Sequence, residues 1–507
     1  MNAVETYEEV ELRASSELSA SEIVQRSDQG LKVLLARHVV TKLLTLASNI
    51  VLARFLSPSD FGTFGIAVFT VTMFSLLADG GLGAALLRLQ RTPTEIQKHS
   101  LFWSQCVLSL SQILLVQLLA APVAQFYKLS PDTVLIIRVI SLGSVVSVFR
   151  TLPTILLERE FRFAEQASVE VWECLTYSVL TILLAINHFG VWSFALSSVM
   201  SQTVSVLLLF KITRYIPRFG YNWSEARALL KFGMQYQLGN VFIFLRDALN
   251  PCLVGFMLGP VSVGLINFAT QTGAYANQLV APFARLYFPI FCRAQSQPDL
   301  IQRACETAVR WNFVVVAGLT CIALPLLDVW VIHVFGEKWT PAVPILACVL
   351  VANTFGTLTG PVIALSNALN RSDLPMKISA LTTILSWGLL IFTVKPMGIV
   401  CFGLIQIVSQ LVQLSIVKKL EPICKIRVWH CVSRTAAVGV LSSLILLICR
   451  NTLHLSQCNI PALIVVSVVS LCVYSFVVNA IWGGIFWREL SAFVWRKYGA
   501  TDHRAAI

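Results

Sequence analysis

The residues of this sequence that are best suited to binding or chemistry are polar side chains that interrupt long apolar segments. Arg37 and Lys42 lie in the first of these segments, together with Thr45 and Asn49. Positions 37, 41, 45, 48 and 49 of this segment follow one another mainly at intervals of three and four residues, so they form a polar stripe along one face of a helix. Cations there can form charge-assisted hydrogen bonds to an anion, and the hydroxyl and amide groups can bind a ligand rich in hydroxyls.

A second group of polar side chains lies further along the chain, in two consecutive apolar segments. Its members are Asn240, Arg246, Asp247, Asn250, Asn267 and Gln271. Ionisable residues at bilayer depth are costly and usually face the interior of a bundle or a water-filled cavity. Two interpretations of Arg246 and Asp247 stay open. They line such a cavity, or they pair with each other or with Asp79 and lock the bundle.

Three carboxylates are candidates for binding a proton or a sodium ion, and so for coupling transport to an ion gradient. They are Asp79, Asp247 and Glu173. Arg37 also has two interpretations, because its long side chain could instead reach lipid head groups from the nearby end of its segment. Lys42 lies deeper in the same segment, so we favour a cavity-lining position for it.

The elements that position these side chains are membrane-spanning helices. The chain has 507 residues, of which 56% are hydrophobic and 13% charged, against about 25% charged residues in ordinary soluble domains. Apolar runs of about 20 residues, long enough to cross a bilayer, recur along it. We therefore predict an all-α polytopic membrane protein with about 14 spans. The predicted spans are 33–56, 61–87, 101–121, 133–156, 167–187, 190–212, 231–256, 261–284, 309–333, 341–366, 376–394, 397–417, 432–449 and 461–486.

The connections between spans alternate in charge. Lys and Arg concentrate at both termini and in every second connection. The intervening connections hold only Arg54, Lys128, Lys338, Lys395 and Arg450. The positive-inside rule then places both termini in the cytoplasm. The net charge of +12 thus reflects topology and affinity for anionic membrane lipids, and does not indicate nucleic-acid binding.

The sequence "LARFLSPSDFG" at residues 52–62 is a polar break between the first two spans. Ser57 suits the N-cap of a helix, Pro58 the first helical position, and Asp60 can reach back as in a capping box. A related sequence, "LVGFMLGPVSVG", occurs at 253–264 and shares Leu-x-x-Phe followed by Pro-x-x-x-Gly. This echo fits a duplicated unit of six spans, a common architecture of transporters.

The hairpin from Leu52 to Arg88 resembles the first hairpin of bacterial polysaccharide flippases. These proteins form part of the multidrug/oligosaccharidyl-lipid/polysaccharide exporter superfamily. The matching features are Leu-Ala-Arg-x-Leu at 52–56, Pro58 to Gly62, and Ala-Asp-Gly-Gly-Leu-Gly at 78–83. The sequence "FGMQYQLGNVFIFLRDALNPCLVGFMLGP" at 232–260 resembles the start of their second lobe. The resemblance covers 31–420 and is strongest in 50–90.

This resemblance implies two six-helix lobes in a V-shaped bundle, followed here by an extra helix pair. The expected divisions are an acidic cytoplasmic tail (1–30), an N-lobe (31–217), a C-lobe (218–420), the extra helix pair (421–487) and a basic cytoplasmic tail (488–507). It also implies transfer of a polyprenyl-diphosphate-linked oligosaccharide across the bacterial inner membrane by alternating access. Polysaccharide polymerase and export proteins are possible partners.

Motifs of other functions are missing from the sequence. It has no phosphate-binding Gly-x-x-x-x-Gly-Lys-Ser/Thr motif, no Gly-x-Ser-x-Gly motif and no His or Cys spacing typical of a metal site, so we expect neither an enzyme nor a cofactor. The alternatives that remain are a drug exporter of the same superfamily, a polymerase, and a scaffold of a polysaccharide synthesis complex. A polymerase is disfavoured, since such enzymes usually present a sizeable outer loop and the predicted outer connections are short.

Overall fold

The computed structural model is built of helices joined by short turns. It describes residues 20–79, 81–87, 93–160, 162–227, 229–231, 233–234, 244–245, 248, 250–293, 295, 297–371, 373–421, 424, 426–452 and 460–482. These residues contain no β-strand. They form parts of two compact units, Met1–Phe244 and Leu245–Ile507. The all-α architecture that the sequence predicts is confirmed.

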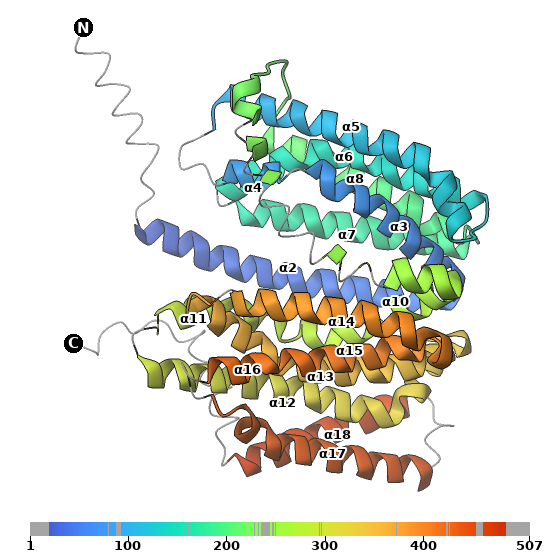
Figure 1. Ribbon diagram of the computed structural model, residues 1–507, viewed down its shortest axis with the longest axis vertical. Helices are drawn as coiled ribbons and strands as arrows, with labels where there is room; N and C mark the ends of the chain where they lie inside the picture. The colour runs from blue at the N-terminus through green and yellow to red at the C-terminus, as the bar shows by residue number, and fades with distance from the viewer. Residues whose placement is uncertain are drawn as a thin grey trace. The chain divides into compact units, whose positions relative to one another are not determined.

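The first unit contains long helices that pack side by side (Figure 1). They are α2 (Ala20–Phe55), α3 (Pro58–Asp79), α4 (Leu82–Leu87), α5 (Glu95–Phe126), α6 (Asp132–Arg159), α7 (Phe163–Ile186) and α8 (Trp192–Thr213). Helix α7 packs against both α2 and α8, and α6 packs against α5 and α8. Helix α7 therefore lies next to the polar helix α2, which decides the partners of the α2 side chains.

The corner between α2 and α3 is a capped helix start, as predicted. Helix α3 begins at Pro58, and the backbone N–H of Asp60 donates to the Ser57 hydroxyl at 3.2 Å. In return, the backbone N–H of Ser57 donates to the Asp60 carboxylate at 2.8 Å. The reciprocal bonds satisfy two backbone donors that the first turn of a helix leaves unpaired.

This corner gives a first test of local stability. Asp60→Ala removes the acceptor of the Ser57 N–H and is expected to lower the free energy of unfolding by about 1 kcal/mol. Thermal melting of the purified protein in detergent measures the effect. Ser59→Ala is the matched control, because the Ser59 side chain makes no hydrogen bond within the described part of the chain. Equal melting shifts in both variants would contradict the capping role.

One predicted span is interrupted in the structure. The sequence suggests a continuous span over 61–87, but α3 ends at Asp79 and a separate short helix, α4, begins at Leu82. Gly81 has φ +61, a left-handed conformation that ends helices and that residues with a Cβ rarely adopt. A Cβ at Gly81 would lie 2.2 Å from the carbonyl oxygen of Gly233. Two backbone segments thus meet directly at the Gly-Gly pair of the 78–83 motif.

The second unit contains the remaining helices. They are the π-helix η1 (Asn250–Val254), α10 (Gly255–Gln278), α11 (Ala281–Arg293), α12 (Pro298–Trp330), the π-helix η2 (Val331–Phe335), the 3₁₀-helix η3 (Glu337–Ala342), α13 (Val343–Ala368), α14 (Asp373–Met397), α15 (Val400–Gln413), α16 (Ser415–Leu420), α17 (Val428–Thr452) and α18 (Ile460–Ile481). Helix α13 packs against α10, α12 and α15, and the terminal helices α17 and α18 both pack on α12.

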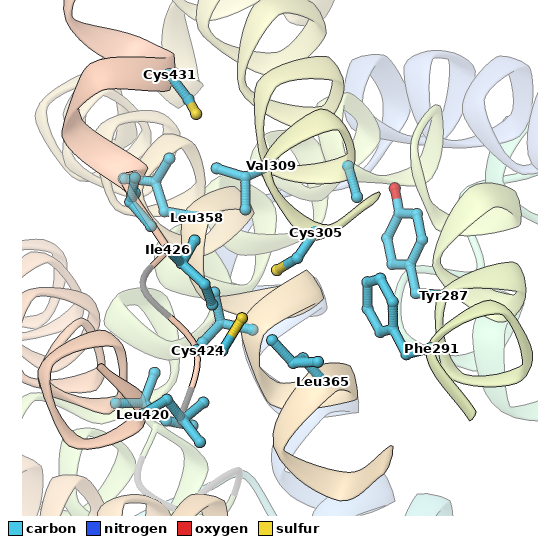
Figure 2. Close-up of a cluster of buried hydrophobic side chains, with 14 of the residues drawn as sticks. Tyr287, Phe291, Cys305, Val309, Leu358, Leu365, Leu420, Cys424, Ile426 and Cys431 are labelled. Carbon is cyan, nitrogen blue, oxygen red and sulfur yellow. The ribbon is translucent and has the colours of Figure 1, made fainter. Parts of the chain in front are cut away.

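A buried apolar cluster joins α11, α12 and α13 to the segment that leads into α17 (Figure 2). Tyr287 and Phe291 lie on one side of it, and Cys424 and Ile426 come from the segment before α17. Cys305 of α12 is completely buried between them as a free thiol. The cysteines of this cluster act as small apolar residues, in agreement with the apolar setting of cysteines in the sequence.

The duplicated sequence pattern corresponds to a similar local structure in the two units. In the first copy the helix stops at Phe55 and restarts at Pro58. In the second copy Gly259 has φ +79 and interrupts α10 directly before Pro260. Both copies therefore break the helix immediately before the proline, which removes a backbone donor and favours a helix start.

Eleven helical segments within the described residues are long and apolar enough to cross a membrane. They correspond to the predicted spans except the first, second and seventh. Half of the seventh lies outside the described residues. Helices α2 and α3 occupy the ranges predicted for the first two spans. A multi-pass membrane protein is thus established, while the total of 14 spans stays a prediction.

Candidate functional site

The polar stripe of α2 lies against α7. Arg37 forms an ion pair with Glu170 of α7, and the Thr45 hydroxyl lies 3.8 Å from the thiol sulfur of Cys174, one helical turn further along α7. The Thr45 hydroxyl also donates to the carbonyl oxygen of Thr41 at 2.7 Å. This bond occupies the proton of Thr45 and leaves its oxygen available as an acceptor.

A second ion pair lies on α7, towards α6. Arg150 of α6 donates to Glu173 at 2.7 Å. Gln166 of α7 donates to Glu158 at 3.1 Å and to Glu170 at 3.4 Å. We call Arg37, Arg150, Glu158, Gln166, Glu170 and Glu173 together the polar cluster. Through it α2, α6 and α7 are connected by charge-assisted hydrogen bonds.

Lys42 differs from the arginines of the polar cluster. It is half-buried on α2, and no described carboxylate lies within ion-pair distance of its ammonium group. The lysine lies nine residues into the predicted span, or about 14 Å along the helix axis. An ammonium group there has lost part of its hydration without gaining a protein anion, so a bound anion would offset its cost.

Asn49 and Asp79 are two further polar residues of the first unit among the predicted site residues. Asn49 is half-buried on α2, three turns beyond Arg37. Asp79 is the last residue of α3, and its side chain lies outside the described residues. The role of Asp79 in ion coupling therefore stays a prediction.

In the second unit, the predicted residues lie on and before α10. Asn267 is half-buried and Gln271, one turn later, is exposed. Asn250 is the first residue of η1, but its side chain is not described, and Arg246 and Asp247 lie outside the described residues. Asn240, which belongs to the first unit, also lies outside them. The water-filled cavity expected from these polar side chains stays a prediction.

The sequence did not single out the partners of the α2 stripe. Glu170 and Cys174 lie four residues apart, so they share one face of α7. That spacing within a predicted span was the available signal. Glu173, predicted as an ion-coupling residue, is paired with Arg150, and its coupling role stays a prediction. No group of three or more metal-ligating side chains occurs in the part of the chain that the structure describes.

A family profile described as "Polysaccharide biosynthesis protein" matches residues 51–344, more than half of the chain. The chain belongs to this family. The match begins at the α2–α3 corner and continues into α13, so it includes the hairpin whose motifs resemble polysaccharide flippases.

Two proteins of bacterial polysaccharide biosynthesis are similar to this chain over most of their length. The succinoglycan biosynthesis transport protein ExoT of Rhizobium meliloti (strain 1021) is 26% identical over 364 residues, which is 70% of each chain. The lipopolysaccharide biosynthesis protein WzxC of Escherichia coli (strain K12) is 23% identical and covers 68% of this chain and 70% of its own. These matches support the predicted membership of the polysaccharide exporter superfamily.

The fold also has a counterpart among solved structures. The lipid II flippase MurJ, in an inward closed conformation, matches with a TM-score of 0.67 over 89% of this chain and 99% of its own. The two sequences are only 12% identical, so this likeness concerns the fold alone. This polysaccharide biosynthesis protein thus shares the all-helical membrane fold of that structure.

Proposed function

We propose that this protein moves lipid-linked polysaccharide repeat units from the inner to the outer leaflet of the bacterial cytoplasmic membrane, by alternating access. The observation that carries the proposal is Lys42, a half-buried cation without a described carboxylate partner, on the polar face of a helix in a polysaccharide biosynthesis protein. The diphosphate of a polyprenyl carrier is an anion that needs such a partner in a low-dielectric environment.

The polar cluster gives this proposal a mechanism. Lys42 binds the diphosphate first, because no described carboxylate has to be displaced from its ammonium group. Arg37 then moves from Glu170 to the diphosphate, since both anions compete for the same guanidinium. Diphosphate binding thereby breaks the ion pair between α2 and α7.

The hydroxyl and amide groups supply contacts to the saccharide. The oxygen of Thr45 and the amides of Asn49, Asn267 and Gln271 are suited to sugar hydroxyls, which both donate and accept hydrogen bonds. In this proposal both termini lie in the cytoplasm, and a polymerase and export proteins act on the repeat units after their translocation.

The proposal is tested in a strain that lacks the protein. Lipid-linked repeat units are expected to accumulate on the inner leaflet, and the full-length chain supplied in trans should restore their movement outward. Accessibility of the units to a glycan-modifying enzyme added outside the membrane distinguishes the leaflets. Normal translocation with failed polymerisation would contradict the proposal and indicate a polymerase, and normal polysaccharide with increased drug sensitivity would indicate a drug exporter.

A further inference from the structure

We call residues 211–231 the linker segment, which comprises the end of α8 and the chain that follows it. The linker segment is held against the start of α5. The indole N–H of Trp103 in α5 donates to the carbonyl oxygen of Arg218 at 3.1 Å. The backbone N–H of Asn222 donates to the hydroxyl of Ser100 at 2.9 Å. These contacts fix the backbone of the linker segment on the end of the first unit, where α5 begins.

The linker segment exposes large apolar side chains although its backbone is fixed. Phe219 stacks on Trp103 with 4.8 Å between ring centroids, yet 92% of Phe219 is exposed. Three neighbours are also exposed, namely Ile216, Tyr221 and Trp223. Tyr and Trp side chains gather at the boundary between a membrane and water, where their apolar rings and polar groups are both satisfied.

Cations surround these apolar side chains. The exposed basic residues of the linker segment are Lys211, Arg214, Arg218, Arg227 and Lys231. Within the described residues, none of them has a carboxylate within ion-pair distance. The single acid of the segment, Glu225, accepts a hydrogen bond from Gln97 of α5 at 3.0 Å. Glu95 of α5 interacts electrostatically with Arg218. Even so, the segment presents an excess of positive charge beside exposed aromatic rings.

We propose that the linker segment is a binding site for anionic phospholipids of the leaflet that it faces. The guanidinium and ammonium groups bind the lipid phosphates, and the rings of Phe219 and Trp223 enter the head-group layer. The combination of charge and aromatic side chains selects this occupant. By contrast, the exposed face of α5 carries apolar side chains such as Val107, Leu110 and Leu114, which suit acyl chains only. This inference does not depend on the cargo that the protein transports.

The binding of fluorescent phosphatidylglycerol to the full-length protein in neutral detergent tests this site. Arg218→Gln with Arg227→Gln is expected to weaken the apparent affinity by about fivefold for each cation removed. Phe219→Ser should weaken it as well, and because Phe219 is almost fully exposed, its loss leaves the protein folded. Hydrogen exchange of peptides from the linker segment should slow in nanodiscs that contain phosphatidylglycerol, compared with nanodiscs of phosphatidylcholine.

A matched pair of cations outside the linker segment provides the control. Lys418→Gln with Lys419→Gln removes the same charge from exposed positions in α16 and should leave the affinity nearly unchanged. Equal losses in the two pairs would overturn the proposal, because general charge would then explain the binding. Displacement of the lipid by glycerol phosphate as effective as by phosphatidylglycerol would also overturn it, since a free-anion site needs no membrane. Unchanged affinity for phosphatidylglycerol in all variants of the linker segment would likewise overturn the proposal.

Discussion

Lys42→Ala is expected to reduce polysaccharide export by about thirtyfold, which corresponds to the loss of one charge-assisted hydrogen bond of about 2 kcal/mol. The amount of protein in the membrane should not fall, because the ammonium of Lys42 has no described carboxylate partner whose charge would be left unpaired. Export is measured as polysaccharide released by a deletion strain that carries each variant, at matched protein levels.

Two controls separate the charge of Lys42 from its size and from general effects. Lys42→Arg keeps a cation at the position and should retain most of the export. Lys395→Ala removes an exposed lysine from the last turn of α14 and should have no effect. Export at the wild-type rate in Lys42→Ala would show that this cation does not bind the transported anion, while leaving the family membership intact.

Gly81→Ala is expected to lower the free energy of unfolding by about 3 kcal/mol, since it combines a left-handed backbone with a steric overlap. The added Cβ would lie 2.2 Å from the carbonyl oxygen of Gly233, an atom of the backbone that cannot rotate away as a flexible side chain can. The melting temperature and the yield of monodisperse protein in detergent should both decrease.

Gly83→Ala is the matched control for Gly81→Ala, because both glycines belong to the same motif. Gly83 lies inside the helix α4, and its nearest neighbour would be the terminal carbon of the Ile155 side chain, at 3.3 Å. A small adjustment of that side chain accommodates a methyl group. If Gly81→Ala were as stable as Gly83→Ala, the close approach of the two backbones would not contribute to the fold.

Features that depend on neighbouring residues could be predicted from the sequence. Ser57 and Asp60 are three residues apart, and their reciprocal hydrogen bonds follow from the chemistry of helix starts alone. The long apolar segments likewise correspond to long helices because bilayer length and backbone hydrogen bonding leave few alternatives. The break at Gly81 escaped prediction, since the backbone it approaches, at Gly233, is more than 150 residues away in sequence.

The ion pairs of the candidate site could not be predicted for the same reason. Arg37 and Glu170 are separated by 133 residues, and only the packing of α2 on α7 brings them together. The sequence left Arg37 with two interpretations, and the structure adds a third, a specific partner in the protein. Lys42 was singled out by its depth alone, and its lack of a described partner emerges only when the neighbours are known.

The pairing of Arg37 with Glu170 has a consequence for how the chain enters the membrane during synthesis. Helix α2 carries Arg37 and Lys42 within its predicted span, and a lone cation in a spanning helix raises the free energy of insertion, by up to about 3 kcal/mol at the helix centre. The neutralising carboxylate belongs to α7 and is translated only after four further long helices have begun. Helix α2 therefore leaves the ribosome well before its neutralising partner and becomes fully stable in the bilayer only when α7 follows. We expect it to remain near the insertion machinery until α7 arrives.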